Sequence, residues 1–316
     1  MTVRVVRPIP VDASKLVATN AAAETVADYD PGTSYTGAVA ATNKPGDMAV
    51  EGDTVYEAMD DVTGVAPSEG VNYSPPVWRA DRSINSMAMF NDTIGDATVG
   101  GEAWPVHSGY GLQVEIQPRR VVGAVAFFGL KGDTVRVELI DDAEGVVYDS
   151  EKSLRSTDGI TTYWAWFFEP IERSTDAIFD DLPSYAGTIR ISIAVSQGQQ
   201  AECGACVIGP ITDLGFLEYE TSVGNLSFST TTRDKFGRTK LIKGPTAKTA
   251  TFNVGMLESE SDRIYRALDS LDATASVWFG TERYKSALIY GFSESFRIVY
   301  SNYSLHRCTL EIEGLV

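Results

Sequence analysis

Hydrophobic and polar residues alternate along much of this chain, as they do in strands whose two faces meet different surroundings. The alternation is strict in TVRVEL at 134–139 and in TIRISIAV at 188–195. By contrast, VVGAVAFF at 121–128 is apolar throughout, so we expect a central strand covered on both faces. Many such short segments, separated by turn residues, predict a mainly β, multidomain protein.

Shifts in this pattern divide the 316 residues into three units. Residues 1–75 combine an N-terminal segment with a small β-module, and the proline-rich stretch 65–78 is interpreted as a linker. Residues 76–212 hold the longest strand patterns and favour a jelly-roll-like β-sandwich. Residues 213–316 follow a hinge at PITDLG, 210–215, and predict an α+β unit in which DKFGRTK, 234–240, forms a turn between strands.

One helix is expected, at about 259–271 in the C-terminal unit. Ser259 is followed three residues later by Asp262, which is a capping signal for a helix start. Apolar residues then recur at helical spacing, at Ile264, Leu268 and Leu271.

The net charge of −17 narrows the range of partners. Nucleic acid would be repelled by such a polyanion, so we expect no nucleic-acid binding. No stretch approaches the ~20 apolar residues of a membrane helix, and the first residues lack the apolar region of a signal peptide. We therefore expect a soluble protein made in the cytoplasm, with no membrane insertion.

The cysteines raise the question of a metal site. Cys203 and Cys206 have the C-x-x-C spacing of redox, zinc and iron–sulfur motifs, and His306 and Cys308 form a second candidate pair. In the alternating segment SLHRCTLEIEGL, 304–315, His306 and Cys308 share the apolar face of a half-buried strand with Leu310 and Ile312. In a continuous strand Cys203 and Cys206 would point to opposite faces, and only a turn at Gly204 would bring their sulfurs together. Free cysteine is also commonly buried. We expect structural thiols, with no metal and no cofactor, and keep the metal or cluster site as the alternative.

No catalytic motif stands out. The chain contains no G-x-S-x-G, no H-E-x-x-H and no glycine-rich phosphate loop. The 43 acidic residues include Asp-Asp pairs, but these pairs fall in apparent turns, where Asp caps the backbone. We expect no catalytic residues and no enzyme activity; a glycosidase is the weaker alternative, testable by turnover of host glycan.

Aromatic residues are the best candidates for ligand binding. Jelly rolls can use loop aromatics as stacking platforms, and the candidates are Trp104, Tyr110, Tyr163, Trp164 and Trp166. Read as a strand, TTYWAWFFEP at 161–170 would carry aromatics on both faces, whereas a sandwich strand needs one apolar face. The aromatic residues on the second face favour a subunit interface in addition to core packing, and sugar binding is the alternative.

An ordered series of segments resembles structural tail proteins of long-tailed bacteriophages, of the baseplate or distal-tail type. The segments are PPVW (75–78), MAMFND (87–92), VAFFGLKGDTVRVELID (125–141), CVIGPITDLG (206–215), TTTRDKFGRTKLIKG (230–244), SVWFG (276–280), IYGFSESFRI (289–298) and LEIEGL (310–315). The resemblance covers most of the chain. It implies a galactose-binding-like jelly roll in the middle and a tail-assembly domain at the C-terminus.

This resemblance also implies a function and a location. We expect a non-enzymatic virion protein of the phage tail or baseplate, synthesised in the cytoplasm of the host bacterium. Its partners would be copies of itself, in a three- or six-fold ring, and other tail proteins. The alternative is a carbohydrate-binding module for host-surface polysaccharide. The N-terminal module resembles small phage modules shared with chitin-type sugar-binding proteins, which usually have Trp where this chain has Tyr29.

Overall fold

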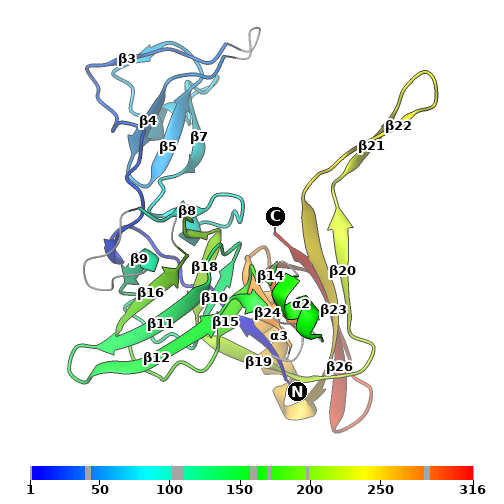
Figure 1. Ribbon diagram of the computed structural model, residues 1–316. Coiled ribbons are helices and arrows are strands. Elements are labelled where there is room, and N and C mark those ends of the chain that lie inside the picture. Colours follow the sequence, from blue (N-terminus) through cyan, green and yellow to red (C-terminus); the bar gives the residue numbers. More distant parts are fainter. Residues whose placement is uncertain are drawn as a thin grey trace.

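The structure is a computed structural model that describes residues 2–39, 44–101, 110–156, 162–168, 172–196, 199–280 and 285–315. Within these residues the protein is mainly β, as predicted, with antiparallel sheets and one helix longer than two turns. The sheets form a C-terminal barrel, a central sandwich and a small N-terminal module (Figure 1).

The barrel closes because β19 pairs with both β1 and β23. Its strand order is β19-β1-β24-β25-β26-β23, and β20 continues the sheet beyond β23. The strands are β1 (Thr2–Val6), β19 (Ile211–Leu217), β20 (Ser222–Ser227), β23 (Thr246–Leu257), β24 (Ser276–Phe279), β25 (Ile289–Val299) and β26 (Leu305–Gly314). The first strand of the chain therefore belongs to the C-terminal unit. The predicted hinge at 210–215 is wrong, because β19 begins at Ile211.

Helix α3 (Ser261–Asp269) supplies part of the barrel core. As predicted, Ile264, Leu268 and Leu271 are buried on one stripe, against strands that include Phe252 and Trp278.

The predicted cap of this helix is wrong. A 3-10 turn, η3 (Glu258–Glu260), precedes α3 and contains Ser259, and Glu260 at the N-cap makes no side-chain cap. The hydroxyl of Ser261 instead contacts the Glu258 carbonyl at 2.9 Å and His306 Nδ1 at 2.6 Å.

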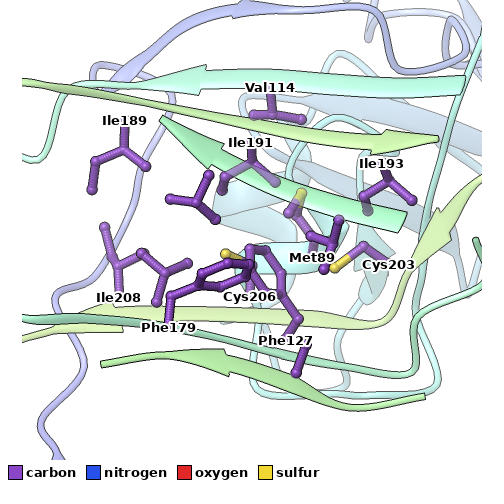
Figure 2. Packing of buried hydrophobic residues seen from close by; sticks show 14 of the residues in the cluster. Met89, Val114, Phe127, Phe179, Ile189, Ile191, Ile193, Cys203, Cys206 and Ile208 are labelled. Atoms are coloured by element: carbon purple, nitrogen blue, oxygen red, sulfur yellow. The ribbon is translucent and has the colours of Figure 1, made fainter. Parts of the chain in front are cut away.

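The central unit is a β-sandwich. A five-stranded sheet, β12-β11-β16-β9-β2, shares one hydrophobic core with a three-stranded sheet, β15-β10-β18 (Figure 2). The strands are β2 (Leu16–Thr19), β9 (Tyr110–Ile116), β10 (Ala124–Phe128), β11 (Thr134–Asp141), β12 (Gly145–Ser153), β15 (Ala177–Phe179), β16 (Thr188–Ala194) and β18 (Ala205–Gly209). Alternate residues of β11 and β16 enter the core, which confirms the alternation in their sequences.

Strand β10 is covered on both faces, as its apolar run predicts. Phe127 faces the sandwich core, whereas Ala126 and Phe128 belong to a second cluster that includes Val277 and Tyr290 of the barrel. The Phe128 and Tyr290 rings stack with centroids 5.5 Å apart. The three-stranded sheet thus joins the sandwich to the barrel, which explains why all five residues of β10 are apolar and buried.

The small module is built around Trp78. Its elements are β3 (Ser34–Tyr35), β4 (Met48–Glu51), β5 (Thr54–Ala58), β6 (Val62–Thr63), α1 (Pro67–Gly70) and β7 (Trp78–Ser83). The Trp78 indole is buried and donates a 3.0 Å hydrogen bond to the Val65 carbonyl. Because Val65 and Val77 also pack on the module core, the stretch 65–78 is an integral part of the module and the linker prediction is wrong. The module sheet continues past residue 75 through β7.

Most of the remaining elements are short: η2 (Ala88–Phe90), β8 (Thr98–Val99), β13 (Arg155–Ser156), α2 (Tyr163–Phe168), β14 (Glu172–Arg173), β17 (Glu202–Cys203), β21 (Thr230–Arg233), β22 (Thr239–Ile242) and η4 (Lys285–Ala287). Helix α2 overturns the predicted strand at 161–170. Residues four apart meet on a helix, and the pairs Tyr163–Phe167 and Trp164–Phe168 have ring centroids 4.9 and 5.3 Å apart. Across the described residues, every helix is too short or too polar to span a membrane.

An ion pair ties the N-terminal segment to β7 and should make stability depend on pH. Glu24 accepts hydrogen bonds from Arg82 at 2.8 and 2.9 Å, and this partner lowers the Glu24 pKa to about 2. The folded-state pKa lies below the ordinary 4.5, so the pair stabilises the fold above that pH and loses this effect as pH falls towards 2.

Glu24→Gln should therefore remove roughly 1–2 kcal/mol of the stability difference between pH 7 and pH 3, measured by urea unfolding at both. Glu69→Gln, at an exposed site on α1, is the control. Equal acid sensitivity of wild type and Glu24→Gln would contradict this account.

Candidate assembly surface

A β-hairpin extends away from the barrel, and we call residues 228–245 the arm (Figure 1). Its strands β21 and β22 pair only with each other, in register from Thr230↔Ile242 to Arg233↔Thr239. The predicted turn at 234–240 is confirmed: Asp234 Oδ1 accepts the Phe236 and Arg238 N–H groups at 2.9 and 2.8 Å. The arm therefore has local order but lacks a core of its own.

Apolar side chains of the arm are open to solvent. Phe236 is 87% exposed and Leu241 is 76% exposed, and Phe228 and Ile242 are also exposed. An isolated two-stranded hairpin is marginal in water, and exposed apolar clusters commonly mark interaction surfaces. The arm is thus a surface that a single copy of the chain leaves uncovered.

The charge of the arm is opposite to that of the rest of the protein. Its cations are Arg233, Lys235, Arg238, Lys240 and Lys243. With Asp234 as the one acid, the arm carries +4, so the remainder of the −17 chain carries −21. Among the described residues, none of these cations takes part in an ion pair. The sequence pattern predicted strands in this segment but did not predict an interaction surface. The signal for it was available: five cations fall within eleven residues of a chain that is otherwise acidic.

Helix α2 is a second exposed apolar feature. Tyr163, Trp164, Phe167 and Phe168 are all exposed, and Trp164 is 64% exposed. The core-packing interpretation is therefore wrong for these four side chains, whereas the interface and sugar-platform interpretations both stay open. Among the other predicted aromatics, Trp166 lies on α2 and Tyr110 begins β9, with side chains outside the described part. Trp104 lies outside the described residues.

Tyr29 is part of the small module's aromatic core. Its ring stacks on Tyr35 with centroids 5.7 Å apart and meets Trp78 edge-on at 6.2 Å. Tyr29 is half-buried in this cluster. Tyr29 therefore contributes to the packing of the module. To bind a sugar as well, its ring would also need one face open to solvent.

Gly204 decides the geometry of the C-x-x-C motif. A bend at Gly204 separates β17 from β18, so Cys203 and Cys206 both lie in the sandwich core (Figure 2). Cys203 and Cys206 would point to opposite faces only in a continuous strand, and the strand is interrupted at Gly204. Cys308 belongs to the separate barrel core. The motif and Cys308 are thus divided between two cores.

The thiols lie in apolar surroundings. All three cysteines are free and buried. Burial raises the pKa of Cys308 to about 11 and raises those of Cys203 and Cys206 further, with Cys203 adding to the shift of Cys206. His306 and Cys308 share the buried face of β26, as predicted, and His306 is occupied by Ser261 and by an edge contact with Tyr300. In the described part of the chain, no three His, Cys, Asp or Glu side chains gather as a metal site.

These surroundings predict unreactive thiols. A thiol reagent at pH 8 should modify none of the three cysteines of the native protein within minutes, because thiolate is scarce and access is blocked. In guanidinium chloride all three should react, which provides the internal control. A fast-reacting thiol in the native protein would contradict the structural role.

In comparisons with known proteins, no family model, no curated sequence and no solved structure matches this chain.

Proposed function

We propose that the protein is a structural virion component of a phage tail tip or baseplate that works by assembling with copies of itself and docking neighbouring tail proteins. The observation that carries the proposal is the arm, which presents uncovered apolar and cationic side chains beyond the barrel. The resemblance of ordered segments to phage tail proteins supports the same function, location and partners.

The arrangement of the molecule suits assembly. An arm that binds elsewhere on a second copy makes a heterologous contact, and such contacts close into rings when the rotation between copies allows it. Three or six copies would match the symmetry of a phage tail. The −17 charge keeps free subunits apart until specific contacts form. In this role the protein has no catalytic step.

Purified virions provide the test. Mass spectrometry should detect the chain at three or six copies per particle, and cryo-electron microscopy should place it as a ring around the tail axis. The comparison sample is a lysate cleared of particles. If the chain stays in that lysate and is missing from virions, the proposal fails.

Exposed α2 supports a second candidate, a carbohydrate-binding module for host polysaccharide. Trp164 is exposed and stacks on Phe168 with an interplanar angle of 30°, which gives an aromatic surface of the kind that sugars stack on. This function would coexist with assembly rather than replace it.

Binding of host polysaccharide to the full chain, followed by calorimetry and by tryptophan fluorescence, tests this candidate. Trp164→Ala should weaken binding at least ~10-fold if α2 is the platform. Phe236→Ala, which removes a still more exposed aromatic from the arm, should leave binding unchanged. Equal binding by wild type and Trp164→Ala, or no binding by either, would exclude α2 as a sugar platform.

A further inference from the structure

The most acidic stretch of the chain is the small module. Residues 28–83 contain ten Asp or Glu and three Lys or Arg, a net charge of −7. Among the described residues, Glu57 is the one acid of this stretch with a cation partner, Arg79. About two fifths of the protein's net negative charge thus lies on one small module.

Three of these acids lie at or next to the loop that contains Thr36 and Gly37. Asp47 Oδ2 accepts the Thr36 N–H at 2.7 Å and Asp61 Oδ1 accepts the Gly37 N–H at 3.0 Å, so both carboxylates border the same loop. Asp60 is adjacent, and its carboxylate accepts the Asp61 N–H at 2.8 Å.

Two exposed methionines are next to these carboxylates in the sequence. Met48 follows Asp47 directly, and Met59 precedes Asp60. The Ala58 N–H donates to the Asp47 carbonyl at 2.9 Å, which brings the two segments together. We call Asp47, Met48, Met59, Asp60 and Asp61 the acidic face.

We propose that the arm of one copy docks on the acidic face of the next copy. The inference rests on the self-assembly proposed above and names the two surfaces that meet. The arm offers exposed apolar side chains among cations, and the acidic face offers three exposed carboxylates and two exposed methionines. Opposite charges steer association and fix its register, and flexible methionine side chains adapt to an inserted aromatic ring.

The two surfaces cannot meet within one molecule in this structure. Figure 1 shows the module and the arm rising from the same end of the molecule on opposite flanks, well separated from each other. A contact between them therefore joins different copies. Because each copy offers one arm and one acidic face, successive copies join head to tail, and such contacts form a ring when the rotation between copies closes.

Charge reversal tests this pairing in the full chain. The arm variant carries Arg233→Glu, Lys235→Glu and Lys240→Glu. The module variant carries Met48→Lys, Met59→Lys and Asp60→Lys, and spares the Asp47 and Asp61 carboxylates that hold the loop.

Each variant alone should self-associate at least ~100-fold more weakly than wild type in sedimentation equilibrium, because like charges would face each other. An equimolar mixture should assemble again, since the reversed arm fits the reversed face and the two unchanged surfaces also match. Native mass spectrometry should then find complexes in which the two variants alternate: equal numbers of each if the ring has six copies, and mixed pairs or open chains if it has three. Raising NaCl from 0.1 to 1 M should weaken wild-type association, because the screening length falls from ~10 to ~3 Å.

Controls separate docking from misfolding. Circular dichroism and thermal unfolding should match wild type for both variants. Asp142→Lys, an exposed reversal at the β11–β12 turn, should assemble normally. The proposal is overturned if the wild type is monomeric at every accessible concentration, if either variant assembles like wild type, or if the two folded variants fail to bind each other.

The outcome is separable from that for the proposed function. If virions contain a ring of the wild-type protein and the charge-reversed variants still assemble normally, the docking proposal is wrong and the proposed tail function is supported. If the two variants restore each other's assembly but the protein is absent from virions, the docking proposal is supported and the proposed tail function is wrong.

Discussion

Removal of the arm should abolish self-association while leaving the protein folded. Ser227 and Thr246 are direct cross-strand partners, so an Asn-Gly pair can replace residues 228–245 as a two-residue hairpin turn. The removed residues belong to neither the barrel core nor the sandwich core, and the midpoint of thermal unfolding should change by less than about 4 °C. Light scattering coupled to size-exclusion chromatography should find a monomer where the full chain forms an oligomer.

A milder variant links this loss to the exposed apolar side chains. Phe236→Ala with Leu241→Ala keeps the hairpin and its charges, and should give association intermediate between the full and shortened chains. An oligomer of normal size from the shortened chain would show that assembly uses other surfaces, and α2 would then be the next to test.

Truncation of Trp278 should strongly destabilise the C-terminal barrel. The side chain is 0% exposed in the barrel core, and its Nε1 donates a 3.1 Å hydrogen bond to the Gly291 carbonyl. Trp278 also sits on β24, between β1 and β25. Trp278→Ala should cost about 3–5 kcal/mol of unfolding free energy in urea titrations, through lost burial and the resulting cavity.

Tyr303→Ala is the matched control, since this aromatic follows β25 and is 97% exposed. It should change stability by no more than about 0.5 kcal/mol. Similar losses for the two variants would mean that the barrel core does not dominate the stability of the C-terminal unit.

Strand periodicity was the most reliable guide to this fold. In β26 the residues His306, Cys308 and Leu310 are buried and their neighbours are exposed, as the alternation predicts. The apolar run of β10 likewise reports burial on both faces. These predictions succeed because the side-chain direction in a strand depends on the local backbone alone.

Contacts between segments far apart in the sequence could not be predicted from strand periodicity. Strand β1 pairs with β19 and β24, more than 200 residues away in sequence, although its own pattern shows only that it is a strand. Helix α2 was predicted as a strand, because a segment that is apolar at every position fits both the helix and the strand period. The C-x-x-C motif depended on a bend at Gly204 that places both thiols in one core.

For the arm, the sequence alone determined the chemistry: a turn at 234–240 between two strands, and five cations in an acidic chain. Only the tertiary structure decided that this hairpin lies outside every core, with Phe236 and Leu241 in solvent. The sequence alone does not distinguish a hydrophobic side chain that packs in the protein's own core from one that contacts a partner. Which of the two applies depends on the packing of distant strands around the barrel, and that packing leaves the arm uncovered.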